Sequence, residues 1–181
     1  MNRLLLAYAP WRLGVHRIFN HFIYPWVKGY KKHPILFTNY KYLDLDVAAQ
    51  KAAIAAVRPG APWDAPHEAA REVLLDALLE YGLLRGPRAT LKRRNAAQRF
   101  TLHHTSHWLG LDVHDRGRYR DEAGAPRKLE PGMVLTIEPG LYVRADEKGV
   151  PREYRGLGIR IEDDVLVTES GARVLTEAAP K

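Results

Sequence analysis

The pattern of apolar and polar positions predicts two helices in the first half of the chain. Residues 45–57 form an Ala-rich run of high helix propensity, which Arg58-Pro59-Gly60 ends. From Asp64 to Gly82, apolar residues recur at helical spacing, with Asp64 as the N-cap and Pro66 in the first turn. The repeating positions are Ala69, Val73, Leu74, Ala77, Leu78 and Tyr81. We therefore expect an amphipathic helix with one face on a core.

After Phe100 the pattern changes to that of strands. Met133–Glu138 follows a Pro131-Gly132 turn and alternates, with Val134, Thr136 and Glu138 on one side and Leu135 and Ile137 on the other. Ile159–Thr168 is expected to be one strand, with Gly158, Arg160, Glu162 and Asp164 on one face and Ile159 and Ile161 opposite. Helices followed by antiparallel-type strands indicate an α+β fold.

Residues 85–99 are basic and lack an apolar period. The stretch contains Arg85, Arg88, Lys92, Arg93, Arg94 and Arg99. We expect a polar loop or a short exposed helix here. A solvated face is the ordinary interpretation of such a run, and contact with phosphate or nucleic acid is the alternative.

Composition narrows the kinds of protein and site. A chain of 181 residues with 46% hydrophobic content is long enough for one ordinary domain. It contains no cysteine, which excludes a disulfide framework and a thiolate metal site. Any metal ion must therefore be held by His, Asp or Glu side chains.

Charge and aromatic content divide the chain near residue 46. Of the net charge of +7, most lies in residues 1–46, where seven Lys/Arg face only Asp44 and Asp46. Ten of the seventeen aromatic residues lie in the same segment. We expect an atypical basic, aromatic segment over 1–46 and the main domain over 47–181. Pro10, Trp11 and Arg12 cut the first apolar run too short for a signal peptide, and no run is long enough to span a membrane, so a cytoplasmic location is expected.

Three separate segments offer metal-ligating side chains. His103, His104, His107 and His114 lie within twelve residues, and in an extended segment the even spacing of His103 and His107 puts them on one side, with His104 pointing away. Glu138 ends a strand, and Glu162 lies on a charged strand face. Each has an ordinary alternative: a hydrogen-bonded core histidine, a solvated strand end, and an ion pair with Arg160. Together they offer ligands for a divalent ion.

Three motifs resemble one known family. They are His107-Trp108-Leu109-Gly110-Leu111-Asp112-Val113-His114-Asp115, the run from Leu129 to Tyr142 containing Thr136-Ile137-Glu138-Pro139-Gly140, and Tyr154 to Asp164 containing Gly158-Ile159-Arg160-Ile161-Glu162-Asp163-Asp164. These resemble the aminopeptidase P (Xaa-Pro aminopeptidase) branch of the creatinase/methionine aminopeptidase family, the "pita-bread" metallopeptidases. The resemblance extends from roughly residue 48 onward. It implies the C-terminal part of that catalytic domain: an incomplete pita-bread fold with a curved, mostly antiparallel sheet.

The resemblance also implies a site and a reaction. Members of this family hold two divalent ions, commonly manganese, with two aspartates, one histidine and two glutamates. The matching positions here are His107, Glu138 and Glu162 as metal ligands. Glu138 is also the implied proton acceptor for a metal-activated water, and His103 and His114 are the implied imidazoles that act on the substrate carbonyl. The implied substrate is a peptide with proline at the second position, cleaved at its N-terminal Xaa-Pro bond.

The two aspartate ligands have no match in this sequence. Asp44 and Asp46 lie two residues apart, where we expect carboxylates that favour a helix start. We therefore expect one ion or none and impaired activity, as in a truncated or rearranged gene or one with a misassigned start. The alternatives are a non-catalytic homologue that binds a partner through 1–46, and nucleic-acid binding through 1–41 and 85–99. We expect neither nucleic acid nor membrane as a partner, and a homo-oligomer stays open.

Overall fold

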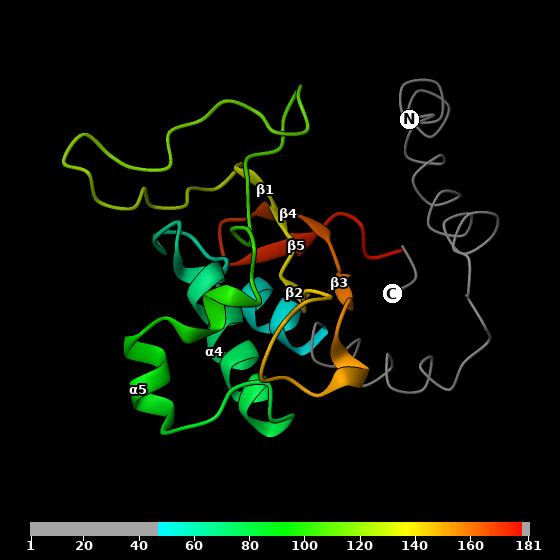
Figure 1. Ribbon diagram of the computed structural model, residues 1–181. Helices are drawn as coiled ribbons and strands as arrows, with labels where there is room; N and C mark the ends of the chain where they lie inside the picture. Colours follow the sequence, from blue (N-terminus) through cyan, green and yellow to red (C-terminus); the bar gives the residue numbers. More distant parts are fainter. Residues whose placement is uncertain (1–46, 179–181) are drawn as a thin grey trace. The chain divides into compact units, whose positions relative to one another are not determined.

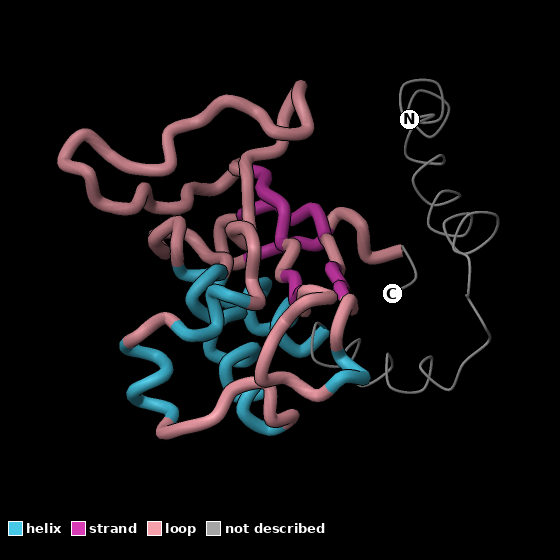
Figure 2. Tube along the Cα trace, in the orientation of Figure 1, coloured by secondary structure: helices cyan, strands magenta, loops and turns pink. Residues whose placement is uncertain are grey.

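The computed structural model describes residues 47–178 (Figure 1). The predictions for segment 1–46, including those for Asp44 and Asp46, lie outside the described residues. In the view of Figure 2 the helices gather below the strands, so that the helical first half covers one side of the strand-rich second half. This arrangement confirms the α+β expectation.

Both predicted helices form. Residues 47–56 are helical, and the chain turns at Gly60, whose φ of 78° favours glycine. Helix α4 (Ala65–Glu80) begins with proline in its first turn and is followed by Gly82 at φ 68°. Asp64 occupies the N-cap position, but among the described residues its side chain makes no capping hydrogen bond. One of its carboxylate oxygens instead lies 3.7 Å from His104 Nε2.

The basic stretch is short, helical and exposed. Helix α5 (Arg88–Arg93) is followed by the 3-10 helix η1 (Ala96–Arg99), and every residue of α5 is at least partly exposed. Arg88 forms ion pairs with Glu72 and Asp76 of α4, and Lys92 pairs with Glu72. The expectation of a short exposed helix is confirmed, and two of its basic side chains are paired with acidic side chains of α4.

Within residues 47–178, five short strands form two antiparallel sheets. Strands β1 (Val134–Ile137), β4 (Asp163–Val167) and β5 (Ala172–Val174) form one sheet in the order β1-β4-β5. Strands β2 (Gly140–Tyr142) and β3 (Gly158–Arg160) form the other, and the 3-10 helix η2 (Arg152–Tyr154) lies between them in sequence.

The prediction of one strand over Ile159–Thr168 is wrong. The stretch divides into β3 and β4, which belong to different sheets, with Ile161 and Glu162 between them. Ile137 lies opposite Asp163 and Gly140 lies opposite Arg160, so the break falls opposite Glu138 and Pro139. Pro139 has no N–H to donate, and the ladder therefore stops there. Alternation of side chains cannot reveal this break, because side chains alternate in the same phase in β3 and in β4.

Helix α4 packs between two apolar clusters. Ala70 and Leu74 belong to the cluster that contains Leu135 and Ile137 of β1. Leu75 and Leu78, with Phe100, belong to the cluster that contains Leu141 of β2. One helix thus fixes both sheets and the junction between β1 and β2.

Two further features concern the surface. The long loop over residues 110–128 extends away from the rest of the described chain, and Leu111 at its start is fully exposed (Figure 1). None of the helices within residues 47–178 is both long and apolar enough to cross a membrane.

Candidate metal centre

The first wall of the site is the segment from Thr105 to Leu109, which runs extended along β1. Three backbone hydrogen bonds fix this register. Leu109 N–H donates to Val134 O, Thr136 N–H to His107 O, and Glu138 N–H to Thr105 O. The segment therefore runs antiparallel to β1. His107 therefore lies beside the end of the strand that carries Glu138.

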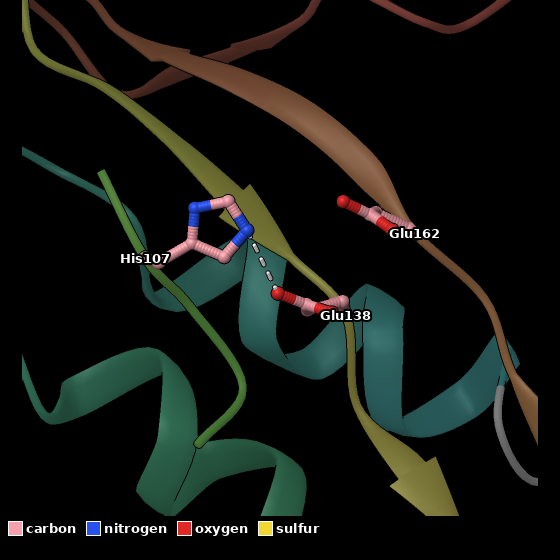
Figure 3. A group of neighbouring side chains, drawn as sticks. All are labelled: His107, Glu138 and Glu162. Atoms are coloured by element: carbon pink, nitrogen blue, oxygen red, sulfur yellow. Dashed lines mark ion pairs between the residues drawn. The ribbon is translucent and has the colours of Figure 1, made fainter. Parts of the chain in front are cut away.

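The second wall is the crossing from β3 to β4. Because Ile137 faces Asp163 in the antiparallel register, one further residue brings Glu138 opposite Glu162. His107, Glu138 and Glu162 each offer a ligand atom, and these atoms lie within 4.8 Å of one another. Figure 3 shows the three side chains approaching one another from three separate segments. Glu138 is buried, His107 is half-buried and Glu162 is exposed.

Hydrogen bonding fixes which nitrogen of His107 faces the carboxylates. Its Nδ1 lies 2.9 Å from the carbonyl oxygen of Trp108, and since a carbonyl can only accept, Nδ1 carries the proton. In the neutral ring, Nε2 then has a free lone pair, and it lies 3.2 Å from Glu138 Oε1. Two lone-pair atoms at this separation repel each other unless a proton or a metal ion lies between them. Metal-ligating histidines typically show this outer hydrogen bond.

The electrostatics of Glu162 also favour a cation. Partial burial and the charge of Glu138 raise the pKa of Glu162, and Arg160 acts in the opposite direction. A divalent ion between the two carboxylates would remove this repulsion. One imidazole and two carboxylates are a ligand set that suits a divalent ion, so these three residues fit the metal that the resemblance implies.

Two other side chains contact Glu138. The hydroxyl of Thr136 lies 3.1 Å from Glu138 Oε1, and Arg160 Nη1 lies 3.5 Å from Oε2. An ion pair with Arg160 was the ordinary alternative for Glu162, and in the structure Arg160 lies within salt-bridge distance of Glu138. No role was predicted for Thr136, although strand alternation already put it on the same side as Glu138.

His114 and His103 have different neighbours in the structure. The exposed His114 ring meets the His107 ring edge to face, with ring centroids 4.2 Å apart. His103 Nδ1 lies 2.8 Å from His104 O, and its Nε2 lies 2.8 Å from the hydroxyl oxygen of Tyr142. Tyr142 was not singled out from the sequence, although it belongs to the same motif as Glu138.

The His104 ring packs against α4. It stacks on His67 of α4, with ring centroids 4.1 Å apart, and both rings line an open pocket of about 280 Å³ with Arg71. Burial lowers the pKa of His67 to about 3, helped by the nearby charges of His104 and Arg71. Burial also lowers the pKa of His104. Both imidazoles are thus neutral near pH 7, and we assign them no chemistry.

Comparisons with known proteins give the family. Residues 28–169 match the model of metallopeptidase family M24, a match that reaches into segment 1–46. The chain is 50% identical over 141 residues to Xaa-Pro aminopeptidase 1 of Streptomyces coelicolor, covering 78% of this chain and 29% of that protein. It is 43% identical over 139 residues to the Xaa-Pro aminopeptidase of Escherichia coli, covering 76% and 31%.

A solved structure shows the same fold. The aminopeptidase PepP of Pseudomonas aeruginosa superposes with a TM-score of 0.74 at 45% identity, over 76% of this chain and 31% of that one. The incomplete pita-bread fold is therefore confirmed, and the chain spans less than a third of the length of these relatives. The chain belongs to metallopeptidase family M24, as a relative of the Xaa-Pro aminopeptidases.

Proposed function

We propose that this chain is a metal-dependent aminopeptidase that hydrolyses the N-terminal Xaa-Pro bond of a peptide. Family membership implies a divalent metal, and the relatives are named Xaa-Pro aminopeptidases. One observation carries the proposal in this chain: His107 Nε2 lies 3.2 Å from a carboxylate oxygen of Glu138, and Glu162 completes the group. This arrangement is stable when a cation lies between the three side chains.

The residues of the site have separate roles in this proposal. His107, Glu138 and Glu162 hold the ion, which when bound supplies the Lewis acidity that polarises the peptide carbonyl and lowers the pKa of water. Glu138 also accepts the proton of the nucleophilic water, because its buried carboxylate lies beside the position of the ion. His114, exposed beside His107, donates a hydrogen bond to the developing oxyanion. His103 orients the substrate carbonyl, and to do so it exchanges one of its present partners, the carbonyl oxygen of His104 or the hydroxyl of Tyr142, for the substrate.

We further propose that a single ion binds, and that it is Mn²⁺. The group supplies three protein ligands, and three ligands with open positions are a workable catalytic set. The two aspartates of the family pattern have no match in the sequence, so a second ion would bind weakly. A non-catalytic homologue that binds only a partner is not favoured, because the three ligand atoms already converge.

Calorimetric titration with Mn²⁺ tests the metal site. We expect saturable binding to the full chain, and its loss in His107→Ala and Glu162→Ala. His104→Ala is the matched control, because it removes an imidazole three residues away that points toward His67. No binding to the unaltered chain, or equal binding to the His107→Ala variant, would refute the metal centre.

A peptide assay tests the reaction. The Mn²⁺-loaded chain is incubated with Ala-Pro-Ala and with Ala-Ala-Ala, and released alanine is measured by mass spectrometry. We expect alanine only from the first peptide and none from the His107→Ala variant. If Mn²⁺ binds but neither peptide is cleaved, the proposed activity is wrong for this chain although the metal centre stands.

A further inference from the structure

The hydroxyl of Thr136 lies between two of the candidate ligands. The backbone N–H of His107 donates to Thr136 Oγ1 at 3.1 Å, and Oγ1 lies 3.1 Å from Glu138 Oε1. Thr136 is 1% exposed, so water cannot readily replace either contact. A buried hydroxyl in this position affects the arrangement of both ligands.

The direction of these hydrogen bonds is forced by chemistry. An amide N–H can only donate, so the hydroxyl oxygen accepts from His107. A carboxylate can only accept, so the hydroxyl proton is donated to Glu138 Oε1. The chain of contacts begins and ends at His107, because the same Glu138 Oε1 lies 3.2 Å from His107 Nε2. The backbone of His107 is thus joined to Glu138 through one hydroxyl, and its ring approaches the same carboxylate oxygen directly.

A competing group pulls Glu138 the other way. Arg160 Nη1 lies 3.5 Å from Oε2, the oxygen that does not face His107. The Arg160 side chain is 49% exposed and can move toward the carboxylate. Without the Thr136 hydroxyl, this charge would be the principal side-chain partner of Glu138 apart from His107, and rotation toward Arg160 would take Oε1 away from Nε2.

We propose that Thr136 is a positioning residue that holds Glu138 Oε1 and His107 Nε2 at ligand spacing before an ion binds. The inference rests on the proposed metal centre for its functional meaning. The physical reason is preorganisation: side chains already held in place lose less conformational freedom when the ion binds. Thr136 does not touch the ion in this proposal and acts only through the two ligands.

The test uses three threonine variants. Thr136→Val keeps the side-chain shape and removes the hydroxyl, whereas Thr136→Ser keeps the hydroxyl. Thr105→Val is the matched control, because Thr105 is also buried, lies on the paired segment and has its hydroxyl 2.9 Å from His67 Nδ1 instead of a ligand. Mn²⁺ affinity is measured by calorimetry, and folding of each metal-free variant is checked by urea denaturation.

We expect Thr136→Val to weaken Mn²⁺ binding by about tenfold or more, the usual effect of removing a group that orients a metal ligand. Thr136→Ser and Thr105→Val should stay within about threefold of the unaltered chain, since both keep the hydroxyl bond to Glu138. In an Arg160→Gln background the Thr136→Val effect should shrink, because the competing charge is gone. Equal affinities for Thr136→Val and the unaltered chain, or an equal loss in Thr105→Val, would overturn the proposal.

A second measurement does not depend on metal binding. In crystal structures of the metal-free chain, Thr136→Val should show Glu138 rotated toward Arg160, with Oε1 no longer within hydrogen-bonding distance of His107 Nε2. An unchanged separation between these atoms would refute the positioning role. If the unaltered chain fails to bind Mn²⁺, the proposed function fails, and this comparison still decides whether Thr136 positions Glu138.

Discussion

Replacing Gly140 by alanine adds a single Cβ at a crowded point beside the candidate site. A Cβ there would lie 2.6 Å from Tyr142 Cε2 and from its hydroxyl oxygen, and 2.8 Å from His103 Nε2. Ordinary van der Waals contacts begin near 3.4 Å. Tyr142 and His103 must therefore move by several tenths of an ångström or more, and they hold each other through a hydrogen bond of 2.8 Å.

The expected cost follows from these contacts. Overpacking of this kind destabilises by about 1–3 kcal/mol, and weakening the His103–Tyr142 hydrogen bond adds about 1 kcal/mol. We therefore expect Gly140→Ala to lower the free energy of unfolding by about 2–4 kcal/mol. Glycine is not needed at this position for a positive φ, so the cost comes from the crowding.

Urea denaturation at pH 7 measures this difference, with Gly171→Ala as the matched control. A Cβ on Gly171 meets nothing within 4 Å among the described residues, so that substitution should be close to neutral. The Gly140→Ala variant should also lose the NMR signature of the hydrogen-bonded His103 imidazole. Equal unfolding midpoints for the two alanine variants would refute the reasoning about the packing beside the site.

Two further predictions concern charge. The pKa of His67, lowered from 6.5 to about 3, means that the unfolded state binds a proton which the folded state rejects, so stability should fall as pH drops from 6.5 toward 3. The loss is up to about 1.4 kcal/mol per pH unit, and a His67→Gln variant should show a flatter pH profile in urea midpoints. Identical profiles would contradict the assignment. Glu162→Gln should leave metal-free stability at pH 7 unchanged or slightly higher, because it removes a carboxylate whose pKa is raised by burial and by Glu138, yet it should weaken Mn²⁺ binding by about tenfold or more. A clear loss of metal-free stability in urea would contradict that reasoning.

The helices and the candidate ligand residues could be predicted from the sequence because their signals are local. Helix propensity predicts a helix over 45–57, which forms over 47–56, and apolar spacing predicts α4. The turns that follow them contain Gly60 and Gly82 at positive φ. His107, Glu138 and Glu162 stood out because imidazole and carboxylate side chains in strand-rich motifs matched a family pattern. Their identities needed no three-dimensional information.

The partners of these residues were decided by tertiary structure. Alternation along 159–168 was correct, but it could not show that the chain leaves one sheet for another at Ile161 and Glu162. Nor could it show that the hydroxyl of Thr136 joins His107 to Glu138, or that Arg160 faces Glu138 instead of Glu162.

The physical reason lies in the range of the forces. Side-chain alternation follows from the backbone of a single strand and is the same whichever strand lies beside it. Register between strands depends on which distant segments bury their apolar faces together and pair their amides. The sequence by itself therefore determined which side chains are candidate ligands, and the packing of α4 against two sheets decided which of their atoms meet.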